Sequence, residues 1–433
     1  MDFIEELTWR GMLHQSMPGT SEQLATGMTS AYIGFDPTAK SLHIGNLATI
    51  MLLVHLQRAG HKPYALVGGA TGMVGDPSGK SAERQFLSEE ILKTNQDGIK
   101  TQLEKFLTFD NAPNAAVMVN NYDWFKEFGF LQFLREVGKY LTVNYMMGKD
   151  SVKNRLTTGI SYTEFTYQLL QGYDFYHLYK HHNVKLQMGG SDQWGNITTG
   201  TELIRRKENN NDENAAYGAY ALTTPLVTKA DGTKFGKSEG GNVWLDPELT
   251  SPYEFYQFWL NQSDEDCKKL IRVFTLYTQV QVESIEIDHA QAPHLRTLQK
   301  AIAEDVTTRV HGAEQYLLAI KTSEILFGKS TFETLQSLDE ASFNTIFTGV
   351  PKSQISKADY ELCTTILDLI STATASEIYP SKSEARKALQ ANAVSINKTK
   401  ITDEKFGLSS LTLLSNKYLL VGKGKKNHII EVV

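Results

Sequence analysis

The chain has 433 residues, of which 41% are hydrophobic and 21% are charged, with a net charge of −6. This length predicts two or three domains, and the composition is that of a globular protein rather than a disordered or fibrous one. Apolar runs stay far below the ~20 residues that span a bilayer, and the acidic N-terminus lacks a targeting pattern. Cys267 and Cys363 have no metal-ligand spacing, so we expect no disulfide framework, no bound metal, no membrane partner and a cytoplasmic location.

The stretch from residue 31 to residue 49 predicts a strand, a tight turn at Asp36-Pro37 and the first turn of a helix. Ser41 is the expected N-cap, because its hydroxyl can accept a backbone amide of that helix. Apolar residues then recur at helical spacing until Gly60, which is expected to end the helix. The open N-terminus of such a helix favours an anion, so this unit is a candidate phosphate site.

Two further predicted strands precede polar loops. Residues 63–69 predict a buried strand followed by the Gly-rich stretch 70–81, and residues 185–190 predict another strand before Asp192-Gln193. Ligands of open α/β sheets bind at the carboxyl ends of the strands, so the glycines and lysine of the stretch 70–81 suit phosphate chemistry. Asp192 and Gln193 are placed to meet a ribose or an amino acid. The intervening segment 88–148 is expected to be mostly helical.

A helix beginning after Ser161 carries three hydrogen-bonding residues on one face. Ser161 and Glu164 have the spacing of a capping box. Tyr167, Gln171 and Asp174 follow at positions i, i+4 and i+7 and share one stripe. A solvated face would more commonly carry Lys and Glu, so we expect this stripe to line a pocket.

The second half of the chain has a different character. Residues 229–238 predict a mobile loop, Ser251-Pro-Tyr-Glu254 predicts the start of a helical region, and residues 328–350 lack strong periodicity and predict a linker. From Ile378 to Val433, ten Lys and Arg residues accompany four Asp and Glu residues on an otherwise acidic chain. Such a basic tail suggests a polyanion that is bound locally.

Two signatures resemble those of class I aminoacyl-tRNA synthetases. Leu-His-Ile-Gly-Asn at residues 42–46 resembles their HIGH motif, with Asn46 in place of the second histidine, and Lys-Phe-Gly-Lys-Ser at 234–238 resembles their KMSKS loop. The likeness to tyrosyl-tRNA synthetases of the bacterial type covers nearly the whole chain. It rests further on Tyr-Ile-Gly-Phe-Asp at 32–36, Val-Gly-Gly-Ala-Thr-Gly at 67–72 and Gly-Gly-Ser-Asp-Gln-Trp-Gly at 189–195.

The resemblance implies an α/β fold with several parts and a homodimer. The expected parts are a Rossmann-like parallel-sheet catalytic domain with a helical dimerisation insertion at 1–220, a mobile loop region at 221–245, an α-helical anticodon-side domain at 246–327, a linker at 328–350, and a small α+β S4-like RNA-binding domain at 351–433.

The implied activity is that of a tyrosine–tRNA ligase. ATP activates L-tyrosine to tyrosyl-adenylate with release of pyrophosphate, and the tyrosyl group then passes to the 3′-terminal adenosine of tRNA(Tyr). By resemblance, Tyr32 and Asp174 hold the substrate hydroxyl, and the tyrosine-binding residues are Tyr32, Asp76, Tyr167, Gln171, Asp174 and Gln193. The implied ATP-binding residues are Gly34, Asp36, His43, Gly45, Asn46, Gly190, Asp192 and Lys237, with Gln187 nearby. Ile33 stands where some relatives place a cysteine against the ribose.

The activation step needs no general base, because the tyrosine carboxylate already attacks as an anion. Positioning and charge stabilisation must therefore supply the rate. By resemblance this work falls to Thr38, His43, Lys80, Arg84, Lys234 and Lys237, with Mg²⁺ accompanying the ATP. Arg205, Arg206 and Lys207 are expected to contact the acceptor stem of the tRNA.

Two other functions stay open at this point. A tryptophanyl-tRNA synthetase shares the fold and both signature loops, although an indole would give Tyr32 and Asp174 a different partner to read. A catalytically degenerate relative that only binds RNA is the second alternative. Asp174 and the lysines at 234 and 237 speak against it.

Overall fold

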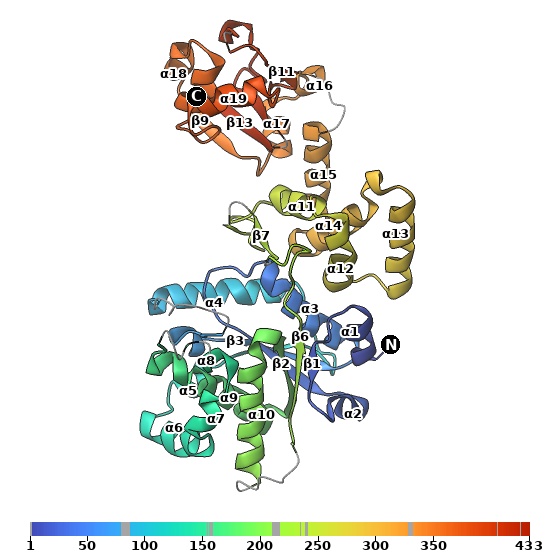
Figure 1. Cartoon of the computed structure of the whole chain (residues 1–433), viewed down its shortest axis with the longest axis vertical. Coiled ribbons are helices and arrows are strands. Elements are labelled where there is room, and N and C mark those ends of the chain that lie inside the picture. Colours follow the sequence, from blue (N-terminus) through green and yellow to red (C-terminus); the bar gives the residue numbers. More distant parts are fainter. Residues whose placement is uncertain are drawn as a thin grey trace. The chain divides into compact units, whose positions relative to one another are not determined.

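The computed structural model describes residues 2–78, 87–153, 155, 159–209, 217–233, 235–238, 241–327, 332–404, 406–424 and 426–433. The chain forms two compact units, and each unit combines two segments of the sequence. One unit comprises Met1–Asp246 and Gln262–Val310, and the other comprises Pro247–Asn261 and His311–Val433. Figure 1 shows the helices and strands of both.

The first unit contains a six-stranded sheet in the order β1-β6-β5-β2-β3-β4. Its strands are β1 (Gln15–Ser16), β2 (Ser30–Phe35), β3 (Lys62–Val67), β4 (Val117–Asn120), β5 (Val184–Gly190) and β6 (Tyr220–Thr224). The strands from β2 to β6 run parallel, and β1 pairs antiparallel with β6. The α/β class predicted from the sequence is thus confirmed. β4 is an addition, because it lies inside the segment that was expected to be mostly helical.

The helices that position the site are α3 (Ile44–Arg58), α9 (Tyr162–His182) and α10 (Trp194–Glu208). α3 is buried along most of its length and packs on β2 and β3, whereas α9 and α10 pack on each other and on β5 (Figure 1). Phe175 of α9 and Ile204 of α10 meet Tyr32 and Leu66 of the sheet in one buried cluster. This core holds α9 beside the strand that carries Tyr32.

The first unit contains further helices. They are α1 (Phe3–Trp9), α2 (Thr20–Ala25), α4 (Glu89–Leu103), α5 (Tyr122–Phe125), α6 (Phe130–Glu136), α7 (Val143–Met147), α8 (Asp150–Lys153), α12 (Asp264–Phe274), α13 (Gln279–Gln291) and α14 (Thr297–His311). A two-stranded hairpin, β7 (Lys237–Ser238) with β8 (Gly241–Asn242), belongs to the same unit.

The predicted N-cap of α3 is wrong by two residues. The cap is His43, whose backbone N–H donates to Asn46 Oδ1 at 3.1 Å. Ser41 Oγ instead accepts a hydrogen bond from Gln102 Nε2 of α4 at 2.9 Å, a tertiary contact that no local pattern indicates. The predicted end of the helix is confirmed, because Gly60 follows the C-cap with a positive φ of 88°.

The second unit contains a five-stranded sheet in the order β11-β10-β12-β13-β9. Its strands are β9 (Lys352–Ile355), β10 (Val394–Ile396), β11 (Thr399–Lys400), β12 (Tyr418–Lys423) and β13 (Lys426–Val432). β12 and β13 form a hairpin, as the apolar runs at 418–423 and 428–432 of the sequence predict, and β9 pairs parallel with β13. The helices of this unit include α11 (Pro252–Leu260), α15 (Ala313–Phe327), α16 (Phe332–Gln336), α17 (Glu340–Ile346), α18 (Lys357–Leu362), a π-helix (Asp368–Ala373) and α19 (Lys382–Gln390).

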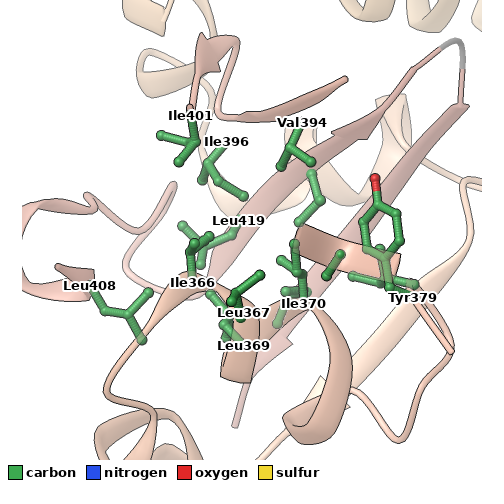
Figure 2. Close-up of a cluster of buried hydrophobic side chains, with 14 of the residues drawn as sticks. Ile366, Leu367, Leu369, Ile370, Tyr379, Val394, Ile396, Ile401, Leu408 and Leu419 are labelled. Atoms are coloured by element: carbon green, nitrogen blue, oxygen red, sulfur yellow. The ribbon is translucent and has the colours of Figure 1, made fainter. Parts of the chain in front are cut away.

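Alternate residues of β12 contribute to two different cores. Leu419 and Val421 face a cluster with Ile366 and Ile370, shown in Figure 2. Leu420, one position along, belongs to a second cluster that includes residues of α15 and α17. Successive side chains of a strand point to opposite faces of the sheet, so this small sheet is covered on both sides.

Residues 332–350 differ from the linker that the sequence predicted. They form α16 and α17, and Phe343 of α17 is stacked on Tyr418 of β12 with ring centroids 4.4 Å apart. Leu335 and Ile346 are buried in the same core. Helices this short show weak periodicity, which is why the sequence pattern missed them. None of the helices in the described part of the chain is long and apolar enough to cross a membrane.

Candidate active site

A cavity of about 260 Å³ opens at the carboxyl ends of the parallel strands, beside the point where the strand order reverses between β2 and β5. Its walls come from β2, β5 and α9, from the first turn of α3 and from the loop after β3. The predicted site residues that line it are Tyr32, Gly34, Asp36, Thr38, Gly45, Asn46, Asp76, Tyr167, Gln171, Asp174, Gln187, Gly190, Asp192 and Gln193. Ile33 lines it as well.

Tyr32 and Asp174 contribute buried polar groups to this cavity, with 1% and 2% of their surface exposed. Among the described residues, the Tyr32 hydroxyl has no hydrogen-bond partner. The Asp174 carboxylate accepts hydrogen bonds from Asn121 Nδ2 at 3.0 Å and from Trp124 Nε1 at 2.9 Å. Because a carboxylate offers roughly four acceptor positions, these two bonds leave room for a ligand that donates.

Burial dominates the electrostatics of this pair. It raises the pKa of Asp174 to about 8, against the hydrogen bonds from Asn121 and Trp124, which lower that pKa. Burial, followed by the charge of Asp174, also raises the pKa of Tyr32 well above its ordinary value. Tyr32 is therefore a neutral phenol that has a proton to donate.

A chain of hydrogen bonds connects Asp174 to the other side of the cavity. Asn121 Nδ2 also donates to Thr71 Oγ1 at 3.0 Å, and Thr71 Oγ1 donates to Asp36 Oδ1 at 2.8 Å. The Tyr167 hydroxyl donates to Asp36 Oδ2 at 2.8 Å. The stripe predicted on α9 is therefore joined through Asp36 and Thr71 to the ends of β2 and β3.

Sequence reasoning missed three members of this network, namely Thr71, Asn121 and Trp124. Asn121 and Trp124 directly follow β4, a strand that the sequence pattern did not reveal. The available signal in the sequence was a pair of asparagines before several aromatic residues. Because β4 was not predicted, the sequence did not show that these residues lie at the edge of the sheet.

The Asp76 carboxylate is the centre of a second group of hydrogen-bonded residues. Its carboxylate accepts hydrogen bonds from Gln193 Nε2 at 2.7 Å, from Asn196 Nδ2 at 3.3 Å and from the backbone N–H of Ser78 at 2.9 Å. Asn196 lies in the first turn of α10 and is 2% exposed. These donors fix the position of the Asp76 carboxylate next to Gln193, which lies just after the end of β5.

The first turn of α3 meets the start of the hairpin β7–β8. A Cβ added to Gly236 would lie 3.0 Å from the backbone nitrogen of Gly45, and Gly236 has a φ of +95°. The Ile44 N–H donates to the Val243 carbonyl at 2.9 Å. His43 packs its ring against Trp244 at this point, with ring centroids 5.8 Å apart. The two signature segments, distant in the sequence, are thus in direct contact.

Some predicted residues fall outside this description. Lys80, Arg84 and Lys234 lie outside the described residues, and Lys237 is described only through its backbone in β7. Within the described part of the chain, no cluster of three or more His, Cys, Asp or Glu side chains could hold a metal ion.

The expected contact of Arg205 with tRNA does not fit the structure. Arg205 is 6% exposed and donates to both carboxylate oxygens of Glu202, at 2.9 and 2.7 Å. Arg206 binds the same carboxylate at 2.5 Å, and Lys207 donates to the Glu136 carbonyl at 2.8 Å. Arg205 therefore serves the packing of α10.

Comparison with known proteins gives one consistent result. Residues 24–328 match the family model of class I tRNA synthetases (W and Y), and residues 342–430 match that of the tyrosine–tRNA ligase SYY-like C-terminal domain. A tyrosine–tRNA ligase of Cytophaga hutchinsonii is 62% identical over 99% of both chains. A tyrosine–tRNA ligase of Porphyromonas gingivalis is 57% identical over 100% of both chains.

Solved structures agree with these relatives. A C-terminally truncated mitochondrial tyrosyl-tRNA synthetase of Aspergillus nidulans has a TM-score of 0.68 and 29% identity, covering 75% of this chain and 94% of its own. A tryptophanyl-tRNA synthetase of Plasmodium falciparum shares the fold at a TM-score of 0.51 and 12% identity, covering 79% of this chain and 88% of its own. The chain belongs to the tyrosyl-tRNA synthetases, the tyrosine–tRNA ligases of class I.

Proposed function

We propose that the cavity binds L-tyrosine with its phenol between Tyr32 and Asp174. We propose that it binds ATP along the first turn of α3 and the segment from Gly190 to Gln193 at the end of β5. The observation that carries this proposal is the buried hydroxyl of Tyr32, which has no partner among the described residues and lies in the same cavity as the buried carboxyl of Asp174. A buried donor without a partner costs free energy, so a ligand that pairs with it gains affinity.

A phenol matches this pair and other rings do not. The oxygen of the substrate phenol accepts a hydrogen bond from the Tyr32 hydroxyl, and the O–H of the phenol donates one to Asp174. Both protein groups then have a hydrogen-bond partner in the ligand. Phenylalanine has no hydroxyl and offers neither group a hydrogen-bond partner. An indole can only donate, so tryptophan leaves the Tyr32 hydroxyl unpaired. The same cavity therefore favours tyrosine over either competitor.

The ammonium group of tyrosine suits the acceptors along α9 and at Asp76. The Tyr167 hydroxyl already donates to Asp36, so its oxygen is available to accept from the ammonium. Asp76 supplies a negative charge whose position is set by Gln193 and Asn196. Gln171, which also lines the cavity, adds a further acceptor.

ATP suits the part of the site beside the first turn of α3, and the residues implied to bind it are Gly34, Asp36, His43, Gly45, Asn46, Gly190, Asp192 and Lys237. A Cβ added to Gly34 would meet only Leu66, at 3.6 Å, so its bare backbone leaves open space for a ligand. The N-terminus of α3 favours phosphate through the positive end of its dipole.

In the activation step, the tyrosine carboxylate attacks the α-phosphorus of MgATP. A bond from carboxylate oxygen to phosphorus forms, the α–β phosphoanhydride breaks, and magnesium pyrophosphate leaves with the bonding electrons. Charge builds on the departing phosphates, where Thr38, His43, Lys80, Arg84, Lys234 and Lys237 are the proposed stabilising groups. A hydroxyl oxygen of the terminal adenosine of tRNA(Tyr) then attacks the acyl carbon. The ester bond forms, the bond from the acyl carbon to the phosphate oxygen breaks, AMP leaves with the bonding electrons, and the hydroxyl proton is released.

An ATP–pyrophosphate exchange assay with the purified chain tests the assignment of the cavity. We expect rapid exchange with tyrosine and only background exchange with phenylalanine or tryptophan. Exchange at equal rates with either competitor would contradict the proposed pairing of the phenol with Tyr32 and Asp174.

The second unit is proposed to bind tRNA through an S4-type surface. Its small sheet packs a basic helix, α19, on one face, and the exposed Lys387 and Lys400 lie on α19 and β11. Lysines on a compact support are suited to phosphate contacts. We place this RNA-binding domain at 351–433, with the catalytic part at 1–220, the loop region at 221–245 and the anticodon-side helices at 246–327. The proposed location is the cytoplasm, where tRNA is charged.

A homodimer is proposed from an apolar surface on the segment 88–148. Phe130 and Leu131 of α6 are 66% and 78% exposed, and Val143 of α7 is 59% exposed. Such a concentration of exposed apolar side chains is typical of an interface. In sedimentation of the purified chain, we expect a particle of twice the 48.5 kDa mass of the chain. A particle of 48.5 kDa would be a monomer and would contradict the proposal.

A further inference from the structure

The indole of Trp124 is held at its face by a residue with no role in the site described above. His177 stacks on it with ring centroids 4.4 Å apart and planes inclined by only 16°. The edge of the same indole donates its N–H to Asp174 at 2.9 Å. Asp174 and His177 are three residues apart on α9 and therefore share one face of the helix. One helix thus holds the indole both by its edge and by its face.

Trp124 needs such contacts because its own helix is short. α5 has four residues, and its N-cap Asn121 makes no side-chain capping bond, because Asn121 Oδ1 accepts instead from the Ala70 N–H at 2.7 Å. An isolated turn of this length has no stability of its own. The orientation of the indole therefore depends on its tertiary partners.

The stack is a contact between neutral rings. Burial lowers the pKa of His177 to about 4, and the neighbouring His181 and His182 add to this effect. A cavity of about 580 Å³ is lined by Trp124, His177 and His182. Without the imidazole of His177, the indole would have space into which it could turn.

We propose that His177 is a positioning residue for tyrosine recognition. By stacking on Trp124 it keeps the indole N–H on Asp174, which aims the remaining acceptor positions of that carboxylate at the substrate phenol. His177 acts through Trp124 and not on the substrate itself. The inference rests on the proposed function, because it requires Asp174 to bind the phenol.

ATP–pyrophosphate exchange with three variants tests the proposal. His177→Ala should raise the KM for tyrosine about three- to tenfold, the range of an aromatic pair, while kcat and the KM for ATP change less than about twofold. His177→Phe keeps a flat ring and should restore the tyrosine KM. His294→Ala is the control, because it removes an exposed imidazole from the turn between α13 and α14, outside α9, and should leave all three constants unchanged.

A double-mutant cycle tests whether the effect passes through Trp124. Trp124→Phe removes the indole donor, so adding His177→Ala to it should change the tyrosine KM by under about twofold more. Thermal melting of each variant identifies any loss of folding, and rescue by His177→Phe keeps the test decisive in that case.

Different results would reject the role of His177 and the proposed role of Asp174 in binding the phenol. An unchanged tyrosine KM in His177→Ala, a His177→Phe variant as weak as His177→Ala, or fully additive effects with Trp124→Phe would each overturn the role of His177. Asp174→Asn, measured in the same series, should lose most tyrosine activation. If it does not, the assignment of Asp174 itself is wrong.

Discussion

Asp174 shows how one residue makes the site sensitive to pH. Its pKa is raised to about 8 by burial, so the carboxyl gains its charge only as the pH approaches that value. The ionised form accepts a phenol O–H more strongly than the protonated form does. We therefore expect kcat/KM for tyrosine to rise as the pH increases, to reach half of its maximum near pH 8 and to level off about one pH unit above that value. Exchange rates at constant ionic strength measure this.

Asp174→Asn is the control for that profile. The variant has no ionisation at this position, so its smaller kcat/KM should not show the rise. The same rise in wild type and variant would assign the ionisation to another group.

Two glycines at the same site are expected to respond differently to alanine. A Cβ on Gly68 would lie 2.2 Å from Asp36 Oδ1 and 2.4 Å from Thr71 Oγ1, so Gly68→Ala should break that hydrogen bond and lower the free energy of unfolding by about 1–3 kcal/mol. Gly34→Ala meets only Leu66 at 3.6 Å and should fold normally while binding ligands poorly. Urea denaturation and exchange kinetics together check this, and equal destabilisation by both would contradict it.

At the residue level, the sequence predicts what is periodic and misses what is only tertiary. Tyr167, Gln171 and Asp174 could be found because one helix face presents them together. Asn121 and Trp124 could not, because their role depends on a short edge strand and on the side chain of a helix far along the chain. The N-cap at Ser41 failed for the same reason.

At the scale of elements, the first turn of α3 and the hairpin β7–β8 act as one support. Gly236 lies against Gly45, and Phe235 is stacked on Phe274 with ring centroids 5.6 Å apart. These contacts place the segment directly before Lys237 against α3 and α12. A cation there is expected to act on the departing phosphates.

Lys237→Ala should therefore lower kcat for adenylate formation at least about tenfold while the affinity for tyrosine barely changes, which is the signature of differential binding. Pre-steady-state adenylate formation measures both constants. Lys229→Ala, a charge removed earlier in the same segment, should have little effect. Loss of tyrosine affinity at normal kcat would reject this role for Lys237.

Element prediction succeeded where the segments were long and failed where they were short. The helix at α9 and the hairpin β12–β13 follow clear patterns, and the structure contains both. α16 and α17 have five and seven residues, so their periodicity was too brief to distinguish from a linker. Only their burial against the sheet of the second unit reveals them.

At the scale of the whole molecule, the core of the second unit decides how tRNA binding can be tested. A cut near Gly349 would separate Phe343 and Ile346 from Leu420 and Ile429, which share one buried cluster. Such a truncation exposes a core and confuses unfolding with loss of an RNA site. Substitution of exposed lysines avoids this.

The variant Lys387→Ala/Lys400→Ala should charge tRNA poorly and show a shallower salt dependence of tRNA affinity, by about one unit of slope for each phosphate that is no longer neutralised. Its ATP–pyrophosphate exchange should be normal. Lys268→Ala/Lys269→Ala removes the same charge from exposed positions in the first unit and should leave the slope unchanged. An unaltered slope in the first variant would make the basic tail a solvated surface.

The central claim is that the buried Tyr32 hydroxyl reads the phenol of the substrate together with Asp174. The most direct measurement compares kcat/KM for tyrosine and for phenylalanine in the wild type and in Tyr32→Phe. We expect the value for tyrosine to fall about 10- to 100-fold, because the phenol loses a buried partner, while the value for phenylalanine stays within about twofold. An equal fall for both amino acids, or no fall for tyrosine, would contradict the claim.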